Sequence, residues 1–310
     1  MEKIKLTYFT PTYNREKLLP NLYKSLLAQT NKSFIWLIVD DGSKDNTEAL
    51  VNDWKKENKI KIEYVKKENG GKHTAIELSN QICTTEFITC VDSDDTLTPD
   101  ATKILYSKFN LCSGDDIVGL VGRRDLVGFT KHKEAAWPEN NMSLYFPELA
   151  SKYNFNFDTI LVFKTDIIKN YHFPIFEDEK FVTESVYYNM FMYDYKMIAF
   201  EEFVYIGEYQ PDGYTSQGMK LFINNPKGYA CALKQNAWLR FKNKKPFKQK
   251  LKSVMQYYGW KKLFKIKADV MPEYKFNILY RFVSKSTDCL SKHILKKRLE
   301  QSLKDSHGKN

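Results

Sequence analysis

Two clusters of aspartates are the residues of this chain best suited to carry chemistry. Asp40 and Asp41 stand in the run VDDGSKDNT, and Asp92, Asp94 and Asp95 stand in the run VDSDD. Crowded carboxylates repel one another unless a hard cation or hydrogen-bond donors neutralise them, and Mg²⁺ or Mn²⁺ suits oxygen ligands that are shared with phosphates. The clusters therefore predict metal-assisted handling of a phosphate group, although either cluster alone could be a turn.

A glycine-containing segment lies between the two clusters. Residues 68–73 read ENGGKH, and Gly70 and Gly71 permit positive φ or a close backbone approach. Lys72 and His73 then open a predicted helix, whose N-terminus favours anions. A diphosphate would fit there, and a plain β-to-α turn is the alternative. Neither GxxxxGK[ST] nor a GxGxxG after the first strand is present, which disfavours a Walker loop and a dinucleotide site.

The elements that must position these residues alternate between strand and helix. Each aspartate cluster directly follows an apolar run that is typical of a buried strand. The alternation predicts an α/β fold with a mostly parallel central sheet and helices on both faces, and ligands in such sheets bind beyond the carboxyl ends of the strands. Asn14 is expected to cap the first helix. The predicted strands are 5–10, 34–39, 61–65, 86–91, 117–122, 159–163 and 197–206, and the predicted helices are 15–29, 45–58, 72–81, 98–110 and 184–194.

Charge divides the chain into two parts. Residues 231–310 hold 21 Lys and Arg against 5 Asp and Glu, a net charge of +16, whereas residues 1–230 carry −6. We expect a catalytic domain over residues 1–220 and a basic, mainly helical C-terminal region over 221–310. The five cysteines form no CxxC pair, the start MEKIKLTYFTP is no signal peptide, and no apolar run is long enough to span a membrane, so we expect a cytoplasmic protein with reduced thiols.

Four segments in order resemble family 2 glycosyltransferases, which have the A-type nucleotide-sugar-binding fold. They are FTPTYNR at 9–15, VDDGS at 39–43, ENGGKH at 68–73 and VDSDD at 91–95, and the resemblance covers roughly residues 4–215. It implies a metal-dependent hexosyl- or N-acetylhexosaminyl-transferase that uses a nucleotide diphosphate sugar, with UDP the expected nucleotide and Mn²⁺ or Mg²⁺ the cofactor.

The resemblance also implies roles for single residues. Thr10, Pro11 and Tyr13 would line the nucleoside pocket, and Asp41 would contact the base. Lys72 would approach the ribose or the diphosphate. Asp92–Ser93–Asp94 matches the DxD motif, with Asp92 near the ribose, Ser93 beside the donor and Asp94 on the metal. Asp95 would shape the acceptor side as a second catalytic residue. The segment 210–216 resembles a loop that closes over the donor.

The catalytic base is the least regular part of the resemblance. Such inverting enzymes use a carboxylate from a Glu-Asp pair at a helix start, and here Glu184 is followed by Ser185. Glu184 is the expected base, Asp178 and Glu179 are fallbacks, and a role of Glu184 in complementing the helix dipole is the alternative.

Several functions are possible for the basic C-terminal region. Residues 242–267 mix lysines with aromatics and would suit an anionic membrane surface, with the aromatics of 257–267 inserted. This would suit a peripheral enzyme of surface-polysaccharide synthesis at the inner face of the membrane, acting on a saccharide or a polyprenyl-linked acceptor. A solvated appendage or dimer contact is the plain alternative, and nucleic-acid binding is disfavoured because no motif accompanies the charge.

Two other functions are alternatives to sugar transfer. A nucleotidyltransferase would need a Gly-, Arg- or Lys-rich loop after the first strand, where this chain reads TPTYNREK. A non-catalytic donor-binding subunit would retain the fold without the base, and Ser185 motivates that reading.

Overall fold

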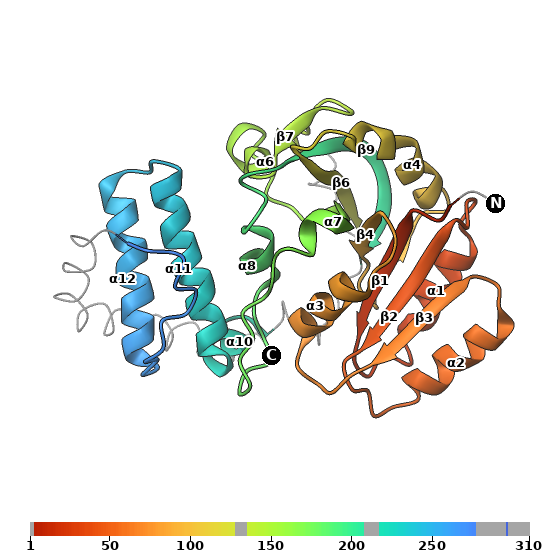
Figure 1. The fold of residues 1–310 in the computed structure, drawn as a ribbon, viewed down its shortest axis with the longest axis horizontal. Helices are drawn as coiled ribbons and strands as arrows, with labels where there is room; N and C mark the ends of the chain where they lie inside the picture. Colours follow the sequence, from red (N-terminus) through yellow and green to blue (C-terminus); the bar gives the residue numbers. More distant parts are fainter. Residues whose placement is uncertain (1–2, 128–134, 208–216, 277–295, 297–310) are drawn as a thin grey trace. The chain divides into compact units, whose positions relative to one another are not determined.

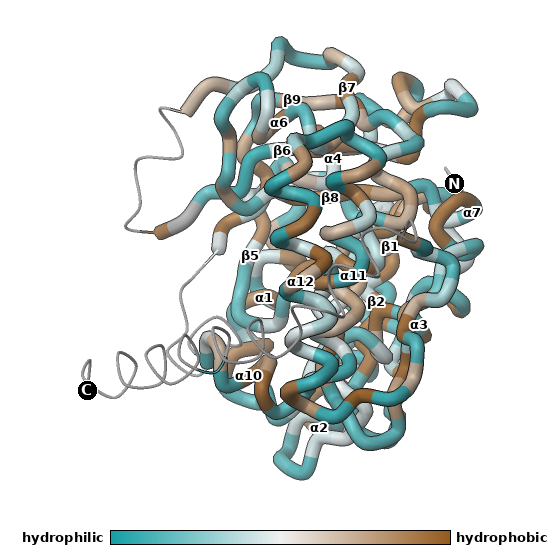
Figure 2. Tube along the Cα trace, turned by 90° about the vertical axis from the view of Figure 1, so that its left-hand side faces the viewer, coloured by the Kyte–Doolittle hydropathy of each residue, from teal (hydrophilic) through white to brown (hydrophobic). Residues whose placement is uncertain are grey.

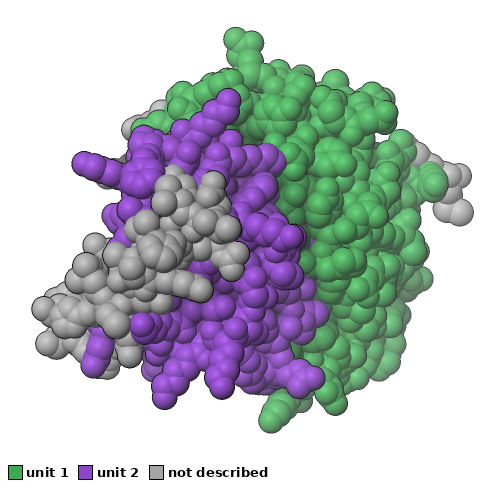
Figure 3. All heavy atoms as spheres, turned by 60° about the vertical axis from the view of Figure 1, so that its left-hand side comes forward, with its two compact units in different colours: residues 1–172, 190–211 green, residues 173–189, 212–310 purple. Residues whose placement is uncertain are grey.

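The computed structural model describes residues 3–127, 135–207, 217–276 and 296. The chain divides into two compact units, one of residues 1–172 with 190–211 and the other of residues 173–189 with 212–310 (Figure 3). No helix in the described ranges combines the length and the apolarity needed to cross a bilayer.

The first unit is built on a mixed sheet of nine strands in its described part (Figure 1). The strand order is β3-β2-β1-β4-β8-β6-β9-β5, with β7 paired to β9. The β3-β2-β1-β4 half and the β6-β9 pair are parallel, whereas β8 runs antiparallel to both of its neighbours. The strands are β1 Leu6–Thr12, β2 Phe34–Asp40, β3 Lys61–Lys66, β4 Phe87–Cys90, β5 Thr96–Leu97, β6 Ile117–Leu126, β7 Ser143–Tyr145, β8 Thr159–Lys164 and β9 Lys196–Gly207.

Helices cover both faces of this sheet, as the strand–helix alternation predicts. One face packs with α1, α2 and α4 in a core that includes Trp36 and Trp54, and α3 contacts β1 and β2 from outside that core. β1 and β2 are buried along their whole length, so both of their faces are covered. Along the helices the trace alternates between hydrophilic and hydrophobic residues (Figure 2). The helices are α1 Leu19–Leu27, α2 Thr47–Glu57, α3 Lys72–Ile82, α4 Ala101–Lys108, the 3₁₀ turn Phe109–Cys112, α6 Pro147–Lys152 and α7 Thr165–Ile168.

The start of the first helix differs from the prediction. The helix begins at Leu19, and Asn14 is no cap but has a φ of +54°. The Asn14 side chain accepts a hydrogen bond from Lys44 N, and its own backbone N donates to Ser43 Oγ. A neighbouring loop therefore uses the groups that a helix cap would have needed, because the carboxyl ends of adjacent parallel strands bring their loops together.

The second unit contains the helices α8 Glu184–Tyr188, α10 Met219–Asn224, α11 Pro226–Lys242 and α12 Phe247–Leu263. Tyr257 and Trp260 are 1% exposed, and the Trp260 indole N donates to the carbonyl of Pro226. The expectation that the aromatics of 257–267 insert into a bilayer is wrong for these two residues. They belong to the core of the second unit, where the burial of their large aromatic area stabilises the packing.

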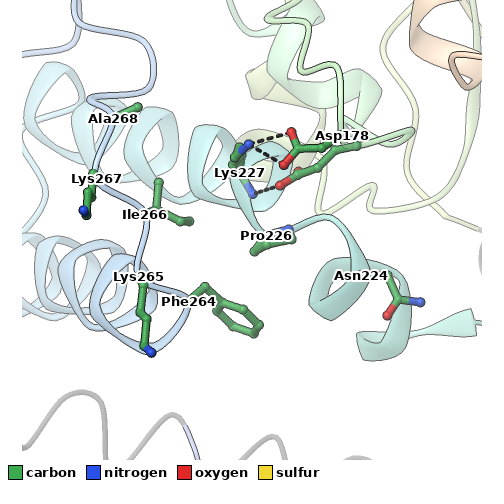
Figure 4. Close-up of a pocket in the computed structure, with 10 residues that line it drawn as sticks. Asp178, Asn224, Pro226, Lys227, Phe264, Lys265, Ile266, Lys267 and Ala268 are labelled. Atoms are coloured by element: carbon green, nitrogen blue, oxygen red, sulfur yellow. Dashed lines mark hydrogen bonds and ion pairs between the residues drawn. The ribbon is translucent and has the colours of Figure 1, made fainter.

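A pocket of about 480 Å³ opens at the N-terminus of α11 (Figure 4). Asp178 forms an ion pair with Lys227, and both oxygens of Glu179 accept backbone N–H groups of residues 227 and 228. None of the predicted donor-binding residues, all of which are described, lines this pocket. Its acidic groups hold the helix start together.

Candidate functional site

The loops that follow β1 and β2 are joined by hydrogen bonds between their side chains and backbones. Arg15 N donates to Thr47 Oγ1, and Glu16 N donates to Asp45 Oδ2. In return, Asn46 N donates to Glu16 Oε2. These hydrogen bonds tie the two loops together at the edge of the sheet where the aspartates lie.

Asp41 is buried and holds the glycine turn of residues 68–71. Its Oδ1 accepts from Gly70 N at 2.9 Å and pairs with Lys67 Nζ at 2.7 Å, and its Oδ2 accepts from Gly71 N at 2.7 Å. Gly71 has a φ of +92°, which favours glycine, and it is the residue from which α3 starts. Both oxygens of Asp41 thus have partners, and its contact with a base stays a prediction.

Asp40 is engaged in the same way. Its Oδ1 accepts from Ser43 N at 2.7 Å, and its Oδ2 accepts from the Tyr64 hydroxyl at 2.5 Å. The Asp40–Asp41 cluster therefore holds two turns together by charge-assisted hydrogen bonds.

Lys72, the first residue of α3, reaches the second cluster. Its Nζ lies 2.6 Å from Asp92 Oδ1. Burial raises the pKa of the Asp92 carboxyl, but Lys72 and Arg124 outweigh burial, so that this pKa is lowered overall. Lys72 and Asp92, two predicted donor-binding residues, are thus brought together although they follow β3 and β4, which are separated by β2 and β1 in the sheet. The helix α3, which packs against β1 and β2, places Lys72 beside Asp92.

Asp94 has a different environment. It is half-buried, and its carboxylate forms no ion pair with any residue of the described ranges. Burial and the neighbouring charge of Asp92 raise its pKa, and Arg15 and Lys72 compensate only in part. A carboxylate held in such surroundings gains from a cation, as the predicted metal role requires.

Asp95 is buried and lies against the sheet. Its Oδ2 accepts from the Arg124 guanidinium at 2.6 Å and from the Tyr205 hydroxyl at 2.7 Å. The structure therefore places this predicted acceptor-side residue in a buried ion pair, and a catalytic role for it stays a prediction.

The other predicted donor-binding residues differ in exposure. Thr10 is fully buried, and its Oγ1 accepts from the Trp36 indole N at 2.9 Å. Pro11 and Ser93 are also buried, whereas Tyr13 is 43% exposed. Of this set, Tyr13 offers the most side-chain surface to a ligand.

The predicted base lies in the second unit. Glu184 is half-buried at the first position of α8, and the Tyr188 hydroxyl donates to its Oε2 at 3.3 Å. Ser185 stands where the resemblance predicts an aspartate. Its Oγ lies 3.2 Å from Thr183 Oγ1. Asp178 pairs with Lys227, and Glu179 accepts two backbone N–H groups, so all three candidate carboxylates have partners within the protein. The choice of Glu184 as the base stays a prediction.

Sequence reasoning missed three residues of the site. Lys67 carries no signal in the sequence, because a lysine after a strand is ordinary. Arg124 stands in the charged run RRD directly after an apolar strand, a signal that could have been noticed. Tyr205 gave no signal, because aromatic residues are ordinary in strands. The predicted closing loop, 210–216, lies outside the described residues.

The residues present fit a divalent cation that is shared with substrate. The described ranges hold no group of three or more His, Cys, Asp or Glu that could form a protein-only cage. Mg²⁺ and Mn²⁺ sites at phosphates commonly use one or two carboxylates, with phosphate and water oxygens completing the shell. Asp94 alone, with a diphosphate, suits that arrangement.

The family model described as "Glycosyl transferase family 2" matches residues 7–171. A Campylobacter jejuni protein, GalNAc(5)-diNAcBac-PP-undecaprenol beta-1,3-glucosyltransferase, is 32% identical over 111 residues, which are 34% of this chain and 35% of the relative. Across eight curated relatives, the match spans 16% to 38% of the relative's length.

Two solved structures resemble the fold over most of the chain. Residues 1–349 of S. aureus TarS in complex with UDP-GlcNAc align with a TM-score of 0.56 at 17% identity, covering 83% of this chain and 81% of that one. The mannosyltransferase PcManGT from Pyrobaculum calidifontis, in complex with GDP-Man and Mn²⁺, aligns with a TM-score of 0.51 at 15% identity, covering 100% and 88%. These likenesses confirm the predicted α/β fold.

Proposed function

Because the chain belongs to glycosyl transferase family 2, we propose that it is an inverting enzyme that moves a sugar from a UDP-sugar to an acceptor hydroxyl. The observation that carries this proposal is the turn of residues 92–95. Its first and last carboxylates are paired within the protein, whereas Asp94 has no ion pair with a described residue, which supports a ligand role for Asp94. The nucleotide assignment rests on the resemblance and on the UDP-GlcNAc complex of TarS.

In this proposal the first unit binds the donor. Tyr13, Thr10 and Pro11 lie at the nucleoside end, and Asp41 holds the glycine turn from which Lys72 extends toward the diphosphate. Asp94 would hold Mn²⁺ or Mg²⁺, which, when bound, neutralises charge on the leaving diphosphate. Ser93 and Asp92 keep the turn beside the ribose.

The transfer step needs a base on the acceptor side. Glu184 would take the proton from the acceptor hydroxyl as the hydroxyl oxygen attacks the anomeric carbon. The bond from that carbon to the diphosphate oxygen breaks, and UDP leaves with the electron pair. Inversion follows because the acceptor oxygen enters opposite the leaving group.

We propose a catalytic domain of residues 1–220 and a basic helical region of 221–310. Residues 227–268 hold 13 Lys and Arg and no Asp or Glu. The turn between α11 and α12 and the helix ends beside it are exposed from Lys242 to Lys248, and Phe247, the first residue of α12, is 54% exposed. With Tyr257 and Trp260 buried, this turn is the part of 242–267 that would meet an anionic membrane surface.

A lipid-linked or saccharide acceptor would suit such a surface. The Campylobacter relative bears a PP-undecaprenol substrate in its name. We propose the same class of acceptor here, with the enzyme cytoplasmic and peripheral on the inner face of the membrane.

The donor is tested by thermal unfolding with UDP, GDP and dTDP, each with and without Mn²⁺. A ligand that binds only the folded state raises its stability by mass action. We expect a rise in Tm for UDP that needs the metal. No rise with any of the three nucleotides would contradict the donor assignment.

The base is tested with Glu184→Gln and a UDP-sugar that the first experiment selects. We expect unchanged UDP binding and a transfer rate lower by about 100-fold or more, the usual contribution of a general base. Glu177→Gln, a change at an exposed neighbouring glutamate, is the matched control. Donor binding without transfer in the wild type would instead support a donor-binding subunit.

The membrane surface is tested by co-sedimentation with vesicles of neutral lipid and with vesicles that also contain anionic lipid. We expect binding to the anionic vesicles that weakens with salt. The double change Lys244→Glu and Lys245→Glu should reduce it by about 10-fold or more, since each lysine near the surface contributes roughly 1 kcal/mol. Lys55→Glu with Lys56→Glu, on the exposed side of α2, is the control, and equal losses in both variants would count against the proposal.

A further inference from the structure

The turn of residues 92–95 is closed by a hydroxyl that comes from a distant strand. The Tyr205 hydroxyl donates to Asp95 Oδ2 at 2.7 Å and accepts from the backbone N of Asp92 at 3.0 Å. Asp95 N in turn donates to the carbonyl of Asp92 at 3.1 Å. One oxygen atom of β9 thus bonds to both ends of the turn that presents Asp94.

The sheet itself brings this tyrosine and its cationic neighbour together. Arg124 on β6 and Tyr205 on β9 are register partners, and β6 and β9 lie side by side (Figure 1). The guanidinium carbon lies 4.9 Å from the centre of the Tyr205 ring. A Cβ at Gly207 would come within 2.2 Å of Arg124 Nε, so the guanidinium fills the space that a larger residue would take.

Arg124 is also one of the two cations that pair with carboxylates of the turn. Asp95 is 2% exposed, and a buried carboxylate needs a charged partner to remain ionised. Arg124 neutralises Asp95 at 2.6 Å, and Lys72 neutralises Asp92 at 2.6 Å. Asp94 is then the carboxylate of the turn with no ion pair among the described residues.

We propose that Tyr205 and Arg124 are positioning residues that fix the turn of residues 92–95 and reserve Asp94 for the donor's cation. The proposal rests on the proposed function, because it takes Asp94 as the metal ligand. Both residues act through Asp95, because both donate a hydrogen bond to its Oδ2. Burial and the charges of Asp92 and Asp95 raise the pKa of Tyr205 well above its usual range, so its hydroxyl stays a donor at neutral pH.

The test is Tyr205→Phe, which keeps the ring over Arg124 and removes both hydrogen bonds to the turn. Its matched control is Tyr8→Phe, which removes a buried hydroxyl that bonds to Thr102 Oγ1 at 3.0 Å, away from the turn. UDP affinity is measured by calorimetry with and without Mn²⁺, and the Mn²⁺ concentration for half-maximal transfer is measured alongside.

We expect Tyr205→Phe to weaken Mn²⁺-dependent UDP binding and to raise the half-maximal Mn²⁺ concentration, each by about 10-fold, with metal-free UDP binding unchanged. Excess Mn²⁺ should restore most of the transfer rate. Tyr8→Phe should lower the Tm without changing either quantity.

Two results would overturn the proposal in distinguishable ways. If Asp94→Asn abolishes Mn²⁺-dependent binding while Tyr205→Phe matches the wild type, the positioning role is wrong and the proposed function stands. If Asp94→Asn itself matches the wild type, the metal role of Asp94 fails, and the positioning role fails with it.

Discussion

The two aspartate clusters at the end of the sheet have similar sequences but different surroundings. All four carboxylate oxygens of Asp40 and Asp41 accept hydrogen bonds, which come from backbone N–H groups, a tyrosine and a lysine. In the second cluster, Asp92 and Asp95 each pair with a cation, whereas Asp94 between them has no ion pair with a residue that the structure describes. The first cluster holds loops together, and the second contains the carboxylate for which we propose a ligand, so residue type alone does not distinguish the two clusters.

The largest effect is expected for Asp94→Asn, which removes the carboxylate proposed to hold the cation. We expect metal-dependent transfer to fall by about 100-fold or more, the size typical of losing a group that stabilises developing charge. Unfolding in urea should show no loss of stability, because no ion pair with a described residue is removed. Initial rates at saturating donor, together with the urea midpoint, measure both effects, and a large loss of stability would mean that Asp94 also supports the turn.

The opposite result is expected for Asp41→Asn. The asparagine cannot accept from Lys67, Gly70 and Gly71 as the carboxylate does, so the free energy of unfolding should fall by about 2 kcal/mol. Urea titration without ligand measures this loss. Asp53→Asn, at an exposed site on α2, provides the control and should change stability little. If the Asp41→Asn protein is as stable as the wild type but cannot bind UDP, Asp41 is a ligand-binding residue and the expected structural role is wrong.

The smallest effect concerns the pH dependence of stability without metal. The pKa of Asp94 is raised in the folded protein above the unfolded value of about 3.9, by burial first and by Asp92 second. Its contribution is therefore fully present below pH 3.9 and is lost as pH rises through the folded pKa. Asp94→Asn lacks this loss, so its stability relative to the wild type should increase with pH.

Urea unfolding in EDTA from pH 3 to pH 7 checks this sign. Asp92, whose pKa is lowered against burial by Lys72, contributes in the opposite direction in both proteins. Removing the Asp94 charge lowers the pKa of Asp92 further, so this coupling also raises the stability of Asp94→Asn relative to the wild type as pH increases. A difference that falls as pH rises would contradict the assigned environment of Asp94.

Much of the first unit was predictable from local patterns. The fully apolar run at 34–39 is typical of a buried strand, and the structure has a strand there. The glycines at 70–71 favour a tight turn, and Gly71 has a positive φ. The prediction failed at Asn14, where a capping residue was taken up by the loop after β2. It also failed at Tyr257 and Trp260, because a lysine-rich aromatic segment has the same composition whether it meets a membrane or another helix.

The fold class, the family resemblance and the clustering of aspartates at strand ends follow from short-range periodicity and residue type, so they can be read from the chain alone. Which carboxylate has a cation beside it depends on long-range packing. Lys67, Arg124 and Tyr205 reach the aspartates from positions 26, 29 and 110 residues away. Pairing at such separations is set by strand order and register, which no local pattern encodes.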